Sequence, residues 1–149
     1  MLSVRFLSLA ALFASFAAGA QQAPCPELPA SSGLSWETMD GPDFVYCRAI
    51  RDSDGSQAFA VMMRAEPDFR ARRSLRDGDP VVIDGQEVYW YRGDVPNALV
   101  RETLVEVDDG RYAHIVLRAA SEDQLAEARR LAESLRFRDV RLGSTGSSR

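Results

Sequence analysis

The sequence has no lysine, and its 149 residues include only one histidine and two cysteines. All 18 basic residues are arginine, which we attribute to the codon bias of a GC-rich bacterial genome and not to a binding site. A serine-hydrolase triad is not indicated, because His114 lies within a predicted strand and no Gly-x-Ser-x-Gly motif is present. Zinc would need several histidine or cysteine ligands, and a glycine-rich phosphate loop is also missing. We therefore expect no cofactor and no enzyme activity, with His114 in a structural role.

Long apolar runs are also missing, except for one short run near the N-terminus. Residues 6–18 carry no charge, follow Arg5 and precede the small residues Ala18-Gly19-Ala20. This pattern is typical of a secretory signal peptide, residues 1–20, and the run is too short to span a bilayer. We expect cleavage after Ala20 and a periplasmic or secreted product. Because Cys25 does not directly follow the small residues, neither a lipid anchor nor a membrane span is expected.

Positive charge is in deficit, since the formal net charge is −4 and loss of Arg5 with the leader would make it −5. An acidic protein is poorly suited to binding nucleic acid, so we expect no such partner. The even cysteine count in an exported chain predicts a disulfide between Cys25 and Cys47. Closing this loop of about 23 residues is worth about 3 kcal/mol by loop-closure entropy. The two cysteines do not have CxxC spacing, so a redox-active pair is not indicated.

The chain after Ala20 is the right length for one domain with a real core. We divide it into a Pro- and Ser-rich arm at 21–35, one α+β domain at 36–142, and a Gly- and Ser-rich tail at 143–149 that we expect to be disordered. Within the domain, alternating apolar residues predict strands at 36–39, 44–50, 57–65, 98–107, 111–119 and 137–142. The segment 81–91 is predicted to form a strand hairpin. The segments 44–50 and 57–65 are expected to pair as an antiparallel hairpin around a polar turn.

Two Asp-Gly pairs predict tight turns within the sheet. Asp84-Gly85 is a strong two-residue hairpin signal, and it places Val82 opposite Glu87 and Val81 opposite Val88.

The second pair, Asp109-Gly110, joins the strands 98–107 and 111–119. A two-residue turn there would place Leu104 opposite Ile115. It would also place Arg101 opposite Arg118, which is unfavourable, so the register of this hairpin stays open.

The best-defined element is a C-terminal helix at residues 122–136. Ser121 is a good N-cap, and Gln124 completes a capping-box pattern with it. An apolar stripe follows at helical spacing, formed by Leu125, Ala128, Leu131, Ala132 and Leu135. These elements predict an α+β fold: a mainly antiparallel sheet of five to seven strands, with one long C-terminal helix packed on one face.

Two clusters are candidate binding residues. Tyr89, Tyr91 and Arg92 follow the Asp84-Gly85 hairpin and form a candidate recognition surface, although packing under a loop would explain the tyrosines as well.

The other cluster lies between Pro67 and Gly78, in a short helix or structured loop. It is a candidate anion patch of four arginines: Arg70, Arg72, Arg73 and Arg76. Neighbouring acidic residues favour a self-neutralised surface instead.

The turn at residues 52–56 begins like a calcium loop but has neither the glycine at position six nor the glutamate at position twelve. We interpret it as a hairpin turn.

The late strand, the capped helix and the ending Ser134-Leu-Arg-Phe137 resemble the Mog1/PsbP-like family of small α/β domains. The resemblance covers about the last 40 to 60 residues. It implies a non-enzymatic role in assembly, chaperoning or binding. The sequence as a whole predicts an exported, non-catalytic binding or assembly module of the bacterial periplasm, with an unknown protein or small ligand of the envelope as partner. The alternatives are a small envelope enzyme that uses paired carboxylates and an inhibitor that presents the loop at 52–56 to a secreted target.

Overall fold

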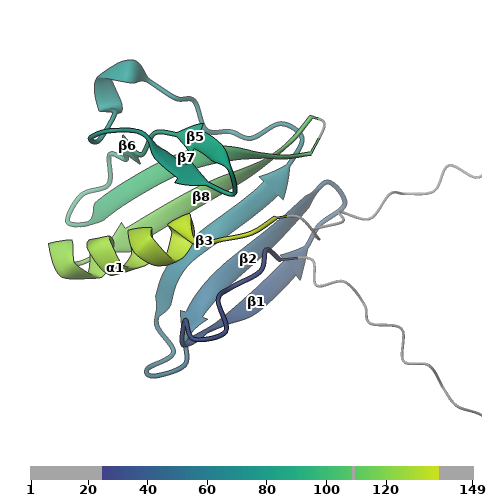
Figure 1. Ribbon diagram of the computed structural model, residues 1–149, viewed down its shortest axis with the longest axis vertical. Helices are drawn as coiled ribbons and strands as arrows, with labels where there is room; N and C mark the ends of the chain where they lie inside the picture. The colour runs from purple at the N-terminus through teal and green to yellow at the C-terminus, as the bar shows by residue number, and fades with distance from the viewer. Residues whose placement is uncertain (1–24, 109, 138–149) are drawn as a thin grey trace, which may run out of the picture.

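The computed structural model describes residues 25–108 and 110–137. Six strands form one antiparallel sheet in the order β1-β2-β3-β8-β7-β6, as Figure 1 shows. Their bounds are Leu34–Asp40 for β1, Phe44–Arg51 for β2, Gln57–Arg64 for β3, Tyr91–Arg92 for β6, Leu99–Asp108 for β7 and Arg111–Ala119 for β8. A separate hairpin pairs β4 (Val81–Ile83) with β5 (Gln86–Val88), and the helix α1 spans Glu122–Glu133. The predicted mainly antiparallel α+β fold is confirmed.

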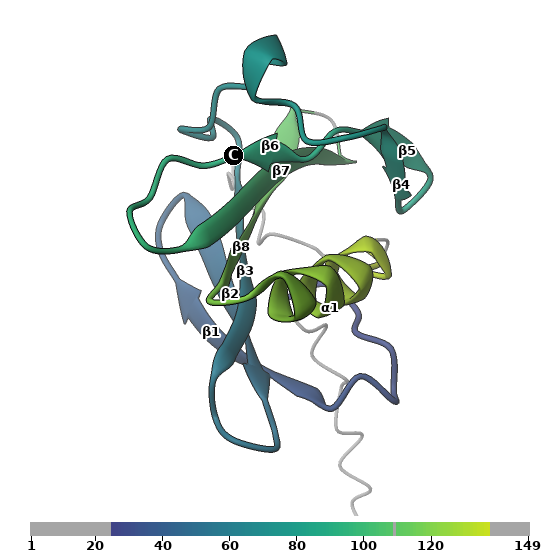
Figure 2. The same ribbon diagram turned by 90° about the vertical axis from the view of Figure 1, so that its left-hand side faces the viewer.

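The helix and the β4–β5 hairpin cover the same face of the sheet, which we call the covered face (Figure 2). Strand alternation sends every second side chain to this face. In β3 these residues are Phe59, Val61 and Met63, and all three are fully buried. Opposite them α1 contributes Leu125, Ala128 and Ala132, and the hairpin contributes Ile83. The core therefore lies between the sheet and this layer.

The helix ends earlier than the sequence predicted, at Glu133 instead of residue 136. Its start is as expected, because the Ser121 hydroxyl accepts a hydrogen bond from the amide of Gln124. At the other end the backbone of Arg136 exchanges two hydrogen bonds with Glu27 of the N-terminal arm. These bonds need extended backbone, so they stop the helix although Leu135 still fills the core.

The Asp84-Gly85 turn is as predicted, with φ of 48° and 82° at its two central residues. The predicted pairs form as well, with Val81 opposite Val88 and Val82 opposite Glu87.

In the other Asp-Gly hairpin the register predicted from a simple turn is wrong by one residue. Leu104 lies opposite His114, not opposite Ile115, because the register shifts between Glu106 and Asp108. The extra residue is Val107, and a bulge of this kind moves every side chain of the strand to the other face.

As a result Arg101 lies opposite Leu117, and the unfavourable pairing of Arg101 with Arg118 is avoided. The bulge therefore removes the like-charge conflict that the uninterrupted register contains.

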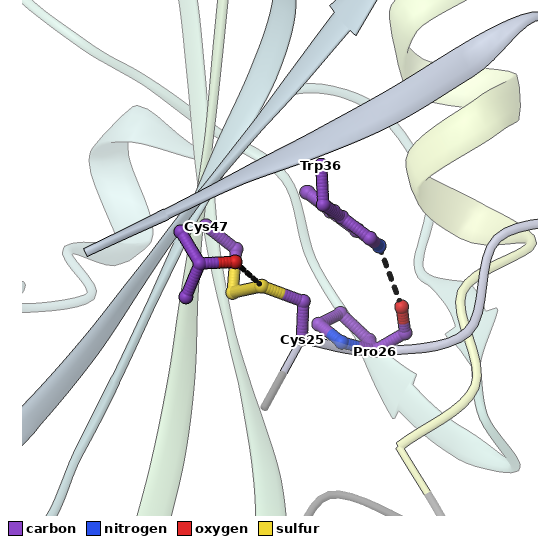
Figure 3. The surroundings of a disulfide bond; sticks show 5 residues. Cys25, Pro26, Trp36 and Cys47 are labelled. Carbon is purple, nitrogen blue, oxygen red and sulfur yellow. Dashed lines mark hydrogen bonds between the residues drawn. A yellow bond between two sulfur atoms is a disulfide. The ribbon is translucent and has the colours of Figure 1, made fainter. Parts of the chain in front are cut away.

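The predicted disulfide joins Cys25 to Cys47, which lies in β2 on the covered face (Figure 3). The hydroxyl of Thr38 lies 3.1 Å from the sulfur of Cys25 and can only donate to it, since a bridged sulfur has no proton. Pro26 accepts a hydrogen bond of 2.8 Å from the indole of Trp36. The arm is thus fastened to the first two strands.

The segment between β3 and β4, residues 65–80, is a structured loop whose regular part is one 3₁₀ turn at Arg73–Leu75. The helix considered for residues 67–78 does not form. Within the described residues, no helix is long and apolar enough to cross a bilayer. The predicted signal peptide, the tail at 143–149 and all of the predicted strand at 137–142 except Phe137 lie outside the described residues.

Candidate functional site

The face of the sheet opposite α1, which we call the open face, is partly covered by residues 65–80. We name this stretch the Phe69 segment. The Phe69 ring stacks on the imidazole of His114 in β8, with ring centroids 5.0 Å apart and planes 22° apart. The same ring makes an edge contact with Tyr91 of β6, at 5.5 Å and 60°. Phe69 therefore joins two strands that are not neighbours in the sheet and forms an aromatic wall with them.

This wall lines an open pocket of about 430 Å³, which we call the Phe69 pocket. Its volume falls within the range of about 300–1,000 Å³ that is usual for small-molecule sites. The aromatic side chains of Phe69, Tyr91 and His114 form one part of the lining, with Leu75 beside them. The charged part consists of three arginines and three carboxylates: Arg70, Arg72, Arg92, Asp68, Asp94 and Glu102. A polar rim around an aromatic wall suits a ligand with both a ring and a charge.

His114 and Glu102 form the least exposed polar pair of the pocket. Nε2 of His114 lies 3.3 Å from Oε1 of Glu102, and their side chains are 17% and 26% exposed. The contact does not have hydrogen-bond geometry, and Nε2 has no other hydrogen-bond partner among the described residues. Burial lowers the pKa of His114 below its ordinary value, and the Glu102 carboxylate opposes this only in part. The imidazole is therefore neutral at pH 7, and acid would convert the contact into an ion pair.

The three arginines of the pocket differ from most arginines of the domain. Arg70, Arg72 and Arg92 are exposed, and none has an ion-pair or hydrogen-bond partner within residues 25–108 and 110–137. By contrast, Arg64 binds both Asp43 and Asp68. Unpaired guanidinium groups contribute little to folding, so their concentration at one pocket calls for another explanation.

The structure brings together residues from both candidate clusters of the sequence. Tyr91 and Arg92 of the proposed recognition surface line the Phe69 pocket together with Arg70 and Arg72 of the proposed anion patch.

The other members lie outside the pocket. The guanidinium of Arg76 packs over the ring of Tyr89, 3.8 Å from its centroid. Arg73 belongs to the exposed 3₁₀ turn. The two clusters are therefore each divided, and two residues of each line the pocket.

Sequence reasoning missed several members of this site, among them Phe69 and the polar pair of His114 and Glu102. His114 was assigned a structural role, and Glu102 was not singled out. They are diagonal neighbours on the open face, because Leu104 lies opposite His114 and Glu102 lies opposite Val116. In the register expected without the bulge at Val107 they would lie on opposite faces. The bulge is therefore what assembles this pair, and the sequence carries no clear signal for it.

A second polar cluster lies on the covered face and is structural. Oδ2 of Asp77 accepts hydrogen bonds of 2.7 Å from Arg101 of β7 and from Arg129 of α1. The bond from Arg101 is the main reason that the pKa of Asp77 lies below its ordinary value, and Arg129 adds to it. Nearby, the indole of the fully buried Trp90 donates to Glu133 at 2.8 Å. A carboxylate held ionised in this way fastens the helix to the sheet and is not suited to act as a general acid.

The loop at 52–56 is a hairpin turn between β2 and β3, as predicted. Asp54 accepts hydrogen bonds from the amide and hydroxyl of Ser56, and both bonds lower the pKa of this carboxyl. Both residues are exposed, so the loop protrudes with fixed geometry. In the described part of the chain, no group of three or more His, Cys, Asp or Glu residues is arranged to hold a metal ion.

Comparison of the chain with protein-family models, with curated protein sequences and with solved structures finds no significant match. The proposed function therefore rests on the geometry and charge of the pocket itself.

Proposed function

We propose that the chain is an exported, non-catalytic binding module of the bacterial periplasm that holds a small ligand in the Phe69 pocket. The observation that carries this proposal is the combination of an aromatic wall with three arginines that lack partners. Groups that contribute little to folding but converge on one concave surface are best explained by a ligand.

Two further observations support export. The disulfide between Cys25 and Cys47 is of a kind that persists in an oxidising compartment such as the periplasm. The apolar run at residues 6–18 supports a cleaved leader. A binding role is also what the resemblance to Mog1/PsbP-like domains implies.

Native mass spectrometry of protein purified gently from the cell envelope tests the proposal. The informative variants are Tyr91→Leu, which alters the aromatic wall, and Tyr89→Leu, which alters a neighbouring tyrosine outside the pocket. We expect the wild type and Tyr89→Leu to carry a stoichiometric small-molecule mass and Tyr91→Leu to lose it. A bare wild-type protein, or a mass that Tyr91→Leu retains in full, would contradict the proposal. The same spectra report whether the chain begins at Gln21.

A second candidate is a small envelope enzyme that uses paired carboxylates. The observation that favours it is that Glu102 and Asp94 line one pocket, with the neutral imidazole of His114 beside Glu102. Such an enzyme would convert the ligand, and Glu102→Gln would abolish conversion while the ligand stayed bound. Incubation of the protein with its co-purified ligand, followed by mass analysis of the small molecule, separates this candidate from a binding module.

A further inference from the structure

The charge balance of the Phe69 pocket favours a negatively charged ligand. The two pocket arginines of the Phe69 segment are exposed, and their side chains have no partners among the described residues. Of the carboxylates, Asp68 pairs with Arg64 at 3.3 Å, whereas Glu102 is only 26% exposed and lies 3.3 Å from the neutral imidazole of His114. Asp94 is the one exposed carboxylate of the lining without a partner there. The accessible charge without a partner is therefore more positive than negative, although the whole chain has a net charge of −4.

The chemistry of the arginine side chains narrows the class of ligand further. A guanidinium is planar, stays charged at all physiological pH values and presents up to five donors, which suits carboxylate, sulfonate and phosphate oxygens. Arg70 and Arg72 both come from the Phe69 segment. Arg92 of β6 lies opposite Arg101, so its side chain alternates to the covered face, away from that of Tyr91. An anionic group beside Phe69 can therefore bind Arg70 and Arg72.

The remaining wall is suited to a ring. Phe69 and His114 are already stacked at 5.0 Å, and Tyr91 contacts the edge of Phe69. A flat ligand can extend this cluster by an offset or edge contact with Tyr91 or Phe69, the arrangements that aromatic pairs prefer. Its charged substituent would then point toward the arginines of the rim.

We infer that the ligand of the Phe69 pocket is an aromatic anion, a small molecule that combines a flat ring with a carboxylate, sulfonate or phosphate group. The inference rests on the proposed function and adds the chemical class of the ligand. The ring packs against Phe69 and Tyr91, and the anionic group binds Arg70 and Arg72.

Isothermal titration calorimetry with three matched probes tests the inference. 2-Naphthalenesulfonate supplies a ring and a permanent negative charge, 2-naphthalenesulfonamide supplies the ring without the charge, and hexanesulfonate supplies the charge without a ring. We expect the aryl sulfonate to bind and each of the other probes to bind at least about tenfold more weakly. Its affinity should also fall as salt is raised, because the arginines are exposed.

Variants then locate the binding site. Arg70→Gln and Arg72→Gln should each weaken binding of the aryl sulfonate about five- to tenfold. Arg130→Gln is the matched control, since Arg130 is an exposed arginine of α1 that also has no partner among the described residues. It should change the affinity less than about twofold, although it removes the same charge. Circular dichroism checks that each variant is folded.

Each other outcome overturns the inference in a recognisable way. Equal binding of the sulfonamide would mean that the pocket does not recognise the charge. Equal binding of hexanesulfonate would mean that the pocket does not recognise the ring. In both cases the pocket would remain a binding site, and the proposed function would stand. If Arg130→Gln weakened binding as much as the pocket variants, the effect would be one of net charge. If no probe bound the wild type, the aromatic anion would be wrong, and the native mass spectra would decide separately whether the pocket holds another ligand.

Discussion

On strand β8, alternate residues serve the two faces of the sheet in different ways. Ala113, Ile115 and Leu117 point to the covered face and are fully buried. His114 and Val116 point to the open face and stay partly exposed. The covered face is closed by α1 and the β4–β5 hairpin (Figure 2). Within the described part of the chain, Phe69 contacts the open face at Tyr91 of β6 and His114 of β8.

The charged groups differ between the faces as well. On the covered face, Asp77 pairs with both Arg101 and Arg129. Around the Phe69 pocket, three arginine side chains have no partner among the described residues. Charge on the covered face therefore stabilises the fold, and we propose that charge at the pocket is available for a ligand. Substitutions on the covered face should therefore lower stability, whereas substitutions at the pocket should weaken ligand binding.

The largest effect is expected from a pair of neighbouring residues in β8. Ile115→Ala should lower the free energy of unfolding by about 2–5 kcal/mol, because it leaves a cavity in a fully buried site. Val116→Ala, on the partly exposed open face, should cost about 1 kcal/mol or less. Urea unfolding of both variants measures the difference. Equal losses of unfolding free energy would mean that side chains on both faces contribute equally to stability.

Removal of the disulfide should cost about 3 kcal/mol, from loop-closure entropy. The variant is Cys25→Ala combined with Cys47→Ala, which avoids an unpaired thiol. Because the bridge lies on the covered face, we expect the affinity for the aryl sulfonate to stay the same in protein that is still folded. Urea unfolding and calorimetry on the same samples test this, and a large loss of affinity would show that the two faces are coupled.

Asp77→Asn should lower stability by about 1.5–3 kcal/mol at pH 7, because it weakens two charge-assisted hydrogen bonds. The pKa of Asp77 is lower in the folded state than in the unfolded state. Its contribution is therefore fully present above the unfolded value of about 3.9 and is lost as pH falls through the folded value. Urea unfolding between pH 7 and pH 2.5 should show the wild type and the variant converging at low pH. A constant gap would exclude titration of Asp77 as the cause.

The smallest effect concerns His114. Its folded pKa is lowered, so the neutral form contributes stability that is present above about pH 6.5 and is lost as pH falls toward the folded pKa. Protonation would also offset the charge of Glu102 and so favour an anion. The groups that face His114 are Glu102 and Leu104 from β7, Met62 from β3, Tyr91 from β6, Asp94 after it, and Asp68, Phe69, Arg70 and Arg72 from the Phe69 segment.

We therefore expect the aryl sulfonate to bind about threefold more tightly at pH 5.5 than at pH 7.5. The variant His114→Asn should show a smaller change. Calorimetry at the two pH values measures both proteins, and an identical pH dependence in the variant would remove His114 from the explanation.

Much of the fold follows from local signals in the sequence. Alternation identifies β2, β3, β7 and β8, the Asp84-Gly85 pair specifies its own turn, and Ser121 marks the start of α1. The end of α1 depends instead on hydrogen bonds with Glu27, which is over 100 positions away in the sequence. No window of local sequence contains that information.

The site is less predictable for a related reason. His114 and Glu102 share a face only because the bulge at Val107 shifts the register of β7 against β8. The position of Phe69 depends on how an irregular loop crosses the sheet, and such a loop has no periodicity to interpret. Tyr91, Arg92, Arg70 and Arg72 were candidates from composition alone, but only the fold shows that they line one pocket.

We propose that Arg70 and Arg72 of the Phe69 pocket serve a ligand and not the fold. Urea unfolding of the double variant Arg70→Gln/Arg72→Gln, with and without 2-naphthalenesulfonate, tests this most directly. Without ligand, the variant should match the wild type within about 0.5 kcal/mol. With ligand at about 100 times the wild-type Kd, the wild type should gain about 2.7 kcal/mol and the variant much less. A variant that is unstable without ligand, or that is stabilised by it as strongly as the wild type, would contradict the account.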